Sequence, residues 1–161
     1  MIKELGKSLL FFDGGMGTLL QKAGLQPGEL PENWNIEKES VIRDIHKAYY
    51  EAGSRILLTN TFGANRIKYQ DQKYTLEQIV CAAIGNVKSV GQDIVVALDV
   101  GPTGKLLKPM GDLSFDDAYE AFKEVMMLGE KTGAQLIHIE TMSDTYEVKA
   151  AVLAAKENTA L

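Results

Sequence analysis

The chain has 161 residues, a formal net charge of −5 and a hydrophobic content of 45%, values typical of one soluble globular unit. The acidic balance, without any block of basic residues, argues against a nucleic-acid-binding surface. No apolar stretch could span a bilayer, residues 1–5 lack the apolar core of a secretion signal, and the single cysteine, Cys81, cannot form an internal disulfide, so we expect a cytoplasmic protein without membrane partners.

Four short apolar runs, each followed by a polar residue, are predicted to be β-strands. They are Leu9–Phe12 before Asp13, Ile56–Leu58 before Thr59, Ile94–Leu98 before Asp99, and Leu136–Ile139 before Glu140. Continuous apolar runs are typical of strands buried on both faces of a parallel sheet that helices cover. The carboxyl ends of parallel strands meet at one edge, where α/β enzymes do their chemistry. We therefore expect the four polar residues to gather there.

A segment with helical periodicity follows each run. The apolar stripes are Val41, Ile45, Ala48 and Ala52; Leu76, Val80, Ala83, Val87 and Val90; Tyr119, Phe122 and Met126; and Val148, Ala151, Val152 and Ala155. The expected amino-terminal caps are Ser40, Thr75 with Gln78, and Ser114, and the expected stops are Gly53, Gly91 and Gly133.

The connections are short after each helix and long after the first three strands, at residues 14–39, 62–74 and 100–113. Long loops are usually functional. Four such units fit either an open doubly wound sheet or part of a barrel, but residues 13–18 lack the spacing of a nucleotide-binding loop. The uniform units favour the barrel, which needs about 250 residues when complete. We predict that residues 1–161 form an α/β fold, the (β/α)4 half of a TIM (β/α)8 barrel with parallel strands in sequential order, truncated after the fourth helix.

Four segments in this order resemble the homocysteine S-methyltransferase family. They are Phe12–Thr18, Leu58–Ala64, Asp99–Gly104 and Ile139–Asp144. The resemblance extends through essentially the whole chain and is strongest to the first half of the amino-terminal module of cobalamin-dependent methionine synthases. Gly101–Gly104 and the Glu140–Thr141 strand end point to that branch rather than to the betaine-dependent one.

The resemblance implies a barrel in which zinc activates the sulfur of homocysteine for methylation to methionine, with methylcobalamin and 5-methyltetrahydrofolate as methyl sources. Activation is needed because a free thiol titrates near pH 8.5 and only the thiolate is a good nucleophile. The family's three cysteine ligands would lie beyond this chain, and Cys81 matches none of them. We therefore expect no bound metal and no catalytic residue here, and no activity without the carboxyl-terminal half-barrel and the cobalamin and folate modules.

The resemblance also implies a substrate-binding role for residues at the strand ends. Asp13 and Glu140 would bind the amino group of homocysteine, since an ammonium group is recognised by carboxylates. Gly14, Gly15 and Thr59 would lie along the substrate, Phe62 would form the pocket wall, and Asp99 is placed in the same pocket.

Several of these residues could have a structural role instead. Asp13 could cap a turn, Glu140 could be a satisfied structural carboxylate, and Phe62 and Asp99 could be structural as well. We expect His138 to be a neutral core residue, His46 to be solvated and Cys81 to pack within a helix. The residues Met110, Met126 and Met127 are expected to pack as well.

Two other functions remain open. The chain could be a small open α/β enzyme that uses Asp13, Asp99 and Glu140 as acid–base or Mg²⁺-binding carboxylates, or a non-catalytic half-barrel that serves assembly. In either half-barrel reading the first and fourth strands have open edges, which invite self-association. The side chains expected to face the opened interior are Phe11, Leu57, Val95 and His138.

Overall fold

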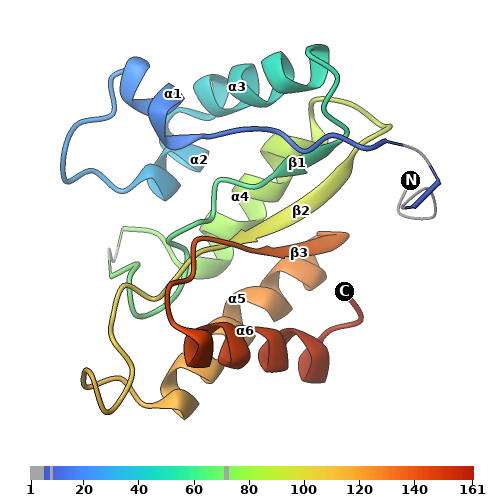
Figure 1. The fold of residues 1–161 in the computed structure, drawn as a ribbon. Helices are drawn as coiled ribbons and strands as arrows, with labels where there is room; N and C mark the ends of the chain where they lie inside the picture. Colours follow the sequence, from blue (N-terminus) through green and yellow to red (C-terminus); the bar gives the residue numbers. More distant parts are fainter. Residues whose placement is uncertain (1–5, 8, 71–72) are drawn as a thin grey trace.

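The computed structural model describes residues 6–7, 9–70 and 73–161, so residues 1–5, assessed above for a secretion signal, lie outside the described part. Three parallel strands form one sheet in the order β1–β2–β3 (Figure 1). They are β1 (Ile56–Leu58), β2 (Val95–Val100) and β3 (Leu136–Ile139). Ile56 is in register with Val95, and Ala97 with Leu136. The predicted parallel and sequential order is confirmed.

The segment 9–12 does not form the predicted first strand. It lies beside β1 and makes one isolated bridge, in which Phe12 pairs with Ile56. The N–H groups of Arg55 and Ile56 donate to the Phe11 carbonyl at 2.9 and 3.1 Å. Leu9 and Phe11 remain 79% and 57% exposed, because the sheet and its helices do not enclose this edge. The prediction that residues 9–12 form a strand buried on both faces is therefore wrong, and the four-stranded half-barrel is not confirmed.

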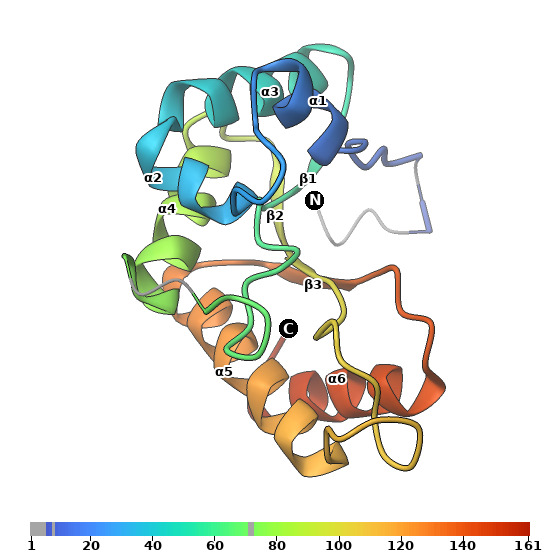
Figure 2. The ribbon, with the colours of Figure 1, turned by 90° about the vertical axis from the view of Figure 1, so that its left-hand side faces the viewer.

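Helices connect the strands and follow one another around the sheet (Figures 1 and 2). The long ones are α3 (Glu39–Glu51), α4 (Leu76–Lys88), α5 (Phe115–Thr132) and α6 (Thr145–Asn158). The loop before α3 contains α1 (Gly17–Lys22), the 3-10 helix η2 (Pro31–Asn33) and α2 (Trp34–Glu37). Consecutive long helices contact each other, as expected when parallel strands are connected in chain order. Among the described residues, no helix is long and apolar enough to cross a membrane.

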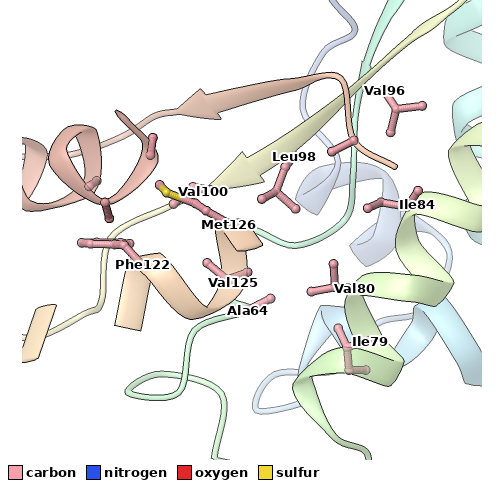
Figure 3. Close-up of a cluster of buried hydrophobic side chains, with 14 of the residues drawn as sticks. Ala64, Ile79, Val80, Ile84, Val96, Leu98, Val100, Phe122, Val125 and Met126 are labelled. Atoms are coloured by element: carbon pink, nitrogen blue, oxygen red, sulfur yellow. The ribbon is translucent and has the colours of Figure 1, made fainter. Parts of the chain in front are cut away.

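Alternate strand residues point to opposite faces of the sheet, which creates two apolar layers. Leu57, Val96 and Leu98 face the helices and pack with α4 and α5 residues such as Ile84 and Phe122 (Figure 3). The other face forms a smaller cluster that contains Ile56, Val95 and Ala97 together with Leu10, Leu58 and Leu136.

Two of the side chains expected on the inner face are therefore placed differently. Leu57 is fully buried on the helix side, and Phe11 is exposed at the edge. Val95 lies in the inner cluster as predicted. The error in β1 is a shift by one residue, which moves every side chain of a strand to the opposite face.

Most of the predicted helix ends are confirmed. Thr75 and Gln78 form a reciprocal capping box at the start of α4. Ser114 accepts a hydrogen bond from the Asp117 N–H, and Gly133 ends α5 with a φ of 102°, a left-handed conformation that favours glycine.

The start of α3 differs from the prediction. Ser40 is not its cap, because α3 begins at Glu39 and Lys38 serves both as the end of α2 and as the start of α3. The buried positions of α3 are Ile42 and His46 rather than Ala48 and Ala52, both of which are exposed. In α6, Val152 of the predicted stripe is 41% exposed, and alanines form most of the buried face.

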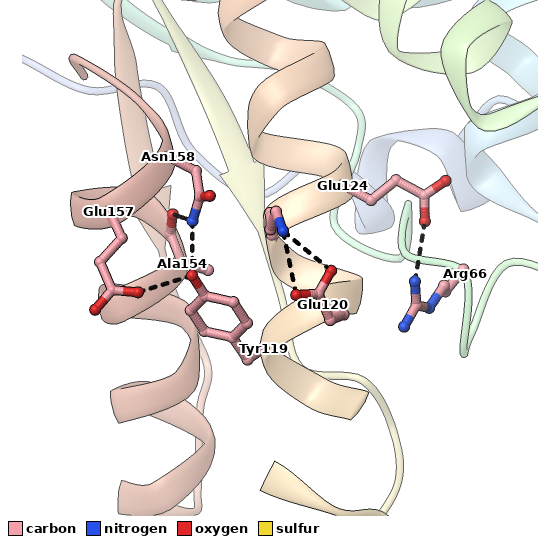
Figure 4. Close-up of polar contacts among 8 residues, drawn as sticks. Arg66, Tyr119, Glu120, Glu124, Ala154, Glu157 and Asn158 are labelled. Carbon is pink, nitrogen blue, oxygen red and sulfur yellow. Dashed lines mark hydrogen bonds and ion pairs between the residues drawn. The ribbon is translucent and has the colours of Figure 1, made fainter. Parts of the chain in front are cut away.

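Polar contacts on the outer surface fix α5 against α6 (Figure 4). The Tyr119 hydroxyl donates to Glu157 Oε2 at 2.7 Å and accepts from Asn158 Nδ2 at 2.9 Å. These contacts keep the last helix in place behind β3, whose carboxyl end supplies part of the site described next.

Candidate functional site

A cavity of about 550 Å³ opens at the carboxyl ends of the strands. Its wall includes all seven residues expected at a substrate site: Asp13, Gly14, Gly15, Thr59, Phe62, Asp99 and Glu140. The segment beside β1, the loop after β1 and the ends of β2 and β3 therefore converge, as the strand-end argument predicts. Binding of a substrate by these residues stays a prediction.

Asp13 is attached to β1 by one of its carboxylate oxygens. Oδ2 accepts a hydrogen bond from the Leu58 N–H at 3.0 Å, while Oδ1 is buried. Burial raises the pKa of Asp13 to about 7, the Leu58 hydrogen bond opposes the rise, and the charge of Glu140 adds to it. Asp13 is thus attached to the end of β1 through Oδ2, and among the described residues Oδ1 has no hydrogen-bond partner.

Asp99, near the end of β2, is more deeply buried, at 7% exposure. Its Oδ1 is buried as well and finds no hydrogen-bond partner within residues 6–7, 9–70 and 73–161. Burial raises the pKa of Asp99 to about 8, with further contributions from the charges of Glu140, Asp13 and Glu32. The charges of these side chains therefore act on one another across the cavity, and at neutral pH Asp13 and Asp99 are partly protonated.

Glu140 lies directly after β3, and its N–H donates to the Val100 carbonyl at 3.1 Å. His138 Nε2 lies 3.6 Å from Glu140 Oε2, and the imidazole ring is 5.2 Å from the Phe12 ring. His138 is half-buried at the cavity wall, so the expectation of a core histidine is wrong. Thr141 has a φ of 57°, a strained conformation for a β-branched residue that turns the chain beside Glu140.

Two threonine hydroxyls fix the position of Asp99. The Asp99 N–H donates to Thr59 Oγ1 at 3.1 Å, and the Thr61 hydroxyl donates to the Asp99 carbonyl at 2.8 Å. The two hydroxyls are 2.6 Å apart. The Thr59 hydroxyl thus holds the backbone of Asp99 in place, and a contact between Thr59 and a substrate stays a prediction.

Close packing explains two glycines near the cavity. A Cβ added at Gly14 would lie 3.0 Å from Tyr49 Oη, and that hydroxyl donates to the Gly15 carbonyl at 3.1 Å. A Cβ added at Gly101 would lie 2.5 Å from Phe62 Cε2. Gly101 therefore leaves room for the Phe62 ring, which forms part of the wall.

Sequence reasoning missed two charged residues of this wall, Glu32 and Lys68. Glu32 is 4% exposed and accepts the Gly63 N–H at 2.7 Å. Burial raises its pKa, and the nearby charge of Lys68 lowers it. Both residues lie in connecting segments that have no helical or strand periodicity. Neither the sequence around Glu32 nor the sequence around Lys68 contains a motif that would identify them.

Four other expectations on single residues are corrected. His46 is fully buried rather than solvated, and burial lowers its pKa to about 4. Cys81 is exposed on α4 rather than packed. Met110 and Met127 are 80% and 47% exposed, whereas Met126 is buried as expected. These corrections share a cause, because the burial of a side chain depends on what covers it as well as on its residue type.

Among the described residues, no group of three or more histidine, cysteine, aspartate or glutamate side chains has the geometry to hold a metal ion. The cavity offers carboxylates and one histidine, and Cys81 is not among its lining residues. A thiolate-rich zinc site does not fit these donors.

Comparisons with known proteins agree with this fold. The family profile described as "Homocysteine S-methyltransferase" matches residues 10–161. The methionine synthase of Mycobacterium tuberculosis is 30% identical over 173 residues, an alignment that covers 97% of this chain and 14% of that protein.

The solved structures of the homocysteine methyltransferase MmuM from Escherichia coli are similar in fold. The metallated form has a TM-score of 0.80 at 19% identity and covers 98% of this chain and 63% of its own. The apo form has a TM-score of 0.67 at 18% identity, with 95% and 57% covered. The chain thus spans less than two thirds of the length of these relatives.

Proposed function

Because the chain belongs to the homocysteine S-methyltransferase family, we propose that it is the homocysteine-binding half of a zinc-dependent enzyme that methylates homocysteine to methionine. The methyl group would come from methylcobalamin and 5-methyltetrahydrofolate, bound by other modules of a longer polypeptide. The 14% coverage of the methionine synthase relative is compatible with such a polypeptide. The 161 residues would be inactive without the rest of the barrel.

The observation that best supports this proposal is the pair of buried, unpartnered oxygens on Asp13 and Asp99 in a cavity that Glu140 also lines. Buried carboxylate oxygens are normally hydrogen-bonded, and an α-ammonium group supplies three donors and a positive charge. The cavity volume of about 550 Å³ also exceeds what a small amino acid requires. We therefore assign Asp13, Asp99 and Glu140 to the amino group, with Phe62 and the Gly14–Gly15 backbone along the rest of the ligand.

In this proposal the two halves of the enzyme have different tasks. Zinc, held by residues outside this chain, would supply thiolate activation. The residues described here would bind and orient the amino-acid end and exclude water from it. The rival reading of an open doubly wound enzyme is disfavoured by the strand order, which shows no reversal in the described sheet.

Homocysteine binding tests the proposal against the remaining alternative, an assembly module. We expect saturable binding when homocysteine is titrated calorimetrically, under reducing conditions, into the chain supplemented with the carboxyl-terminal half, and weaker binding to the chain alone. Butanethiol, which lacks both charged groups, is the control ligand. The absence of homocysteine binding in both settings would contradict the proposal.

We also propose that the isolated chain self-associates through its open edges. The outer edge of β3 pairs with no other strand in the described structure, and Leu9 and Phe11 are exposed beside β1. Light scattering at high concentration is expected to give a mass above 17.7 kDa, and Phe11→Lys is expected to lower it. Met110→Lys, a change at an exposed loop residue, is the matched control. A monomeric wild-type chain would refute this proposal.

A further inference from the structure

Acidic side chains outnumber basic ones in the wall of the cavity. Four are carboxylates, from Asp13, Glu32, Asp99 and Glu140, and the one lysine is Lys68, with no arginine among the lining residues that the structure describes. The carboxylates suffice for an ammonium group, but they repel the carboxylate that every α-amino acid also carries. A positive charge on the wall would offset this repulsion when the zwitterion binds.

The backbone around Lys68 is held in place by a side-chain turn. Asn65 Oδ1 accepts from the N–H groups of Ile67 and Lys68 at 3.1 and 2.9 Å, and Asn65 is 2% exposed. The aliphatic stem of Lys68 passes close to Gly63 and Gly104, since a Cβ added at either position would lie in ordinary van der Waals contact with it, 3.4 Å from Cε and 3.9 Å from Cδ. The loop thus holds the lysine at a defined position on the wall.

The ammonium group of Lys68 lies 4.6 Å from the centroid of the Phe62 ring, so a cation–π contact orients it toward the wall that Phe62 forms. Among the ion pairs of the described part of the chain, none involves Lys68. The carboxylate that it influences, Glu32, directs Oε1 to the Gly63 N–H instead. Within the described residues, a ligand carboxylate that reached Lys68 would therefore have no ion pair to displace.

We propose that Lys68 binds the α-carboxylate of the amino-acid thiol, opposite the carboxylates that bind its ammonium group. This inference rests on the proposed function, and it makes Lys68 a determinant of specificity for the intact zwitterion. Phe62 would position the Lys68 ammonium group through the cation–π contact.

The test compares two thiols that differ only in the α-carboxylate: homocysteine and 3-aminopropane-1-thiol. Lys68→Met keeps the aliphatic stem and removes the charge. In calorimetric titrations of the chain supplemented with its carboxyl-terminal half, we expect this variant to bind homocysteine about tenfold more weakly and the decarboxylated thiol within about twofold of the wild-type affinity. Lys68→Arg, which retains the charge, should recover most of the loss. Lys149→Met, a change on α6 away from the cavity wall, is the matched control.

Each outcome separates the two proposals. If wild-type protein does not bind homocysteine, the proposed function fails, and this inference fails with it. If Lys68→Met weakens both thiols equally, Lys68 has a structural role, and only the inference is overturned. An unchanged homocysteine affinity in Lys68→Met, with the protein folded by circular dichroism, overturns it as well.

Discussion

The double variant Asp13→Asn/Glu140→Gln is expected to bind homocysteine at least 100-fold more weakly than the wild-type chain. A hydrogen bond to a charged group contributes about 1.5–3 kcal/mol, and about 1.4 kcal/mol corresponds to a factor of ten in affinity, so the loss of two reaches this size. Both replacements preserve shape, and the carbonyl oxygen of the introduced amide could still accept the Leu58 N–H that Asp13 Oδ2 accepts now. The loss should therefore report charge and not misfolding.

A second ligand makes the result specific. 4-Sulfanylbutanoate has the thiol and the carboxylate of homocysteine but no ammonium group, and the double variant should bind it at least as tightly as the wild type does, because two repelling charges are gone. Calorimetric titration measures both affinities, and Asp44→Asn, an exposed change on α3, serves as the control. Equal weakening for both ligands would contradict the assignment of Asp13 and Glu140 to the amino group.

The fold was predictable from the sequence where a local hydrophobic or capping pattern agrees with the burial that the residues have in the structure. The apolar run Ile94–Leu98 lies largely within β2, where every residue is buried, and the capping box of Thr75 and Gln78 marks the start of α4 correctly. The segment 9–12 is just as apolar, yet it is largely exposed at an edge, because burial depends on what covers a segment and not on its composition. The same limit explains α3, where Ala48 and Ala52 are exposed and His46 is buried instead.

The carboxylates of the candidate site were predictable for a topological reason. Parallel strands in sequential order bring residues at their carboxyl ends together, so Asp13, Asp99 and Glu140 reach one cavity from distant parts of the sequence. Glu32 and Lys68 reach it from connecting segments, where no period or strand end indicates a direction. Their positions depend on specific tertiary hydrogen bonds, such as the one from the Gly63 N–H to Glu32, which a sequence pattern does not encode.

The raised pKa values of Asp13 and Asp99 predict that the protein loses stability as the pH rises through neutrality. Both groups have a pKa near 3.8 when unfolded, but about 7 and about 8 in the native state. Between these limits the native state holds protons that the unfolded state has released, so the free energy of unfolding falls with increasing pH. We expect a loss of roughly 2 kcal/mol between about pH 6.5 and about pH 8.5, measured by urea unfolding at each pH.

Stability should be measured above about pH 6.5 because, at lower pH, His46 changes the free energy of unfolding in the opposite direction. Burial lowers the pKa of His46 from 6.5 to about 4, so the unfolded state binds the extra proton in that range, and stability there increases with pH. Above about pH 6.5 the contribution of His46 is nearly complete, so the change of unfolding free energy with pH there reports Asp13 and Asp99.

Asp99→Asn is expected to reduce this dependence of the unfolding free energy on pH. At about pH 8.5 the variant should be more stable than the wild type by about 1–2 kcal/mol. Asp112→Asn, at an exposed loop position, should leave the pH dependence unchanged.

The protons held by Asp13 and Asp99 should also affect homocysteine binding. A ligand ammonium group that pairs with Asp13 and Asp99 favours their ionised forms, so homocysteine binding near neutral pH should release protons to the buffer. Calorimetry in two buffers of different ionisation enthalpy measures that number directly, and Asp99→Asn should reduce it. A stability that stays constant or rises between about pH 6.5 and about pH 8.5, or a binding step without proton release, would mean that these carboxylates are already ionised in the folded protein, and that their buried oxygens are compensated by something other than a bound proton.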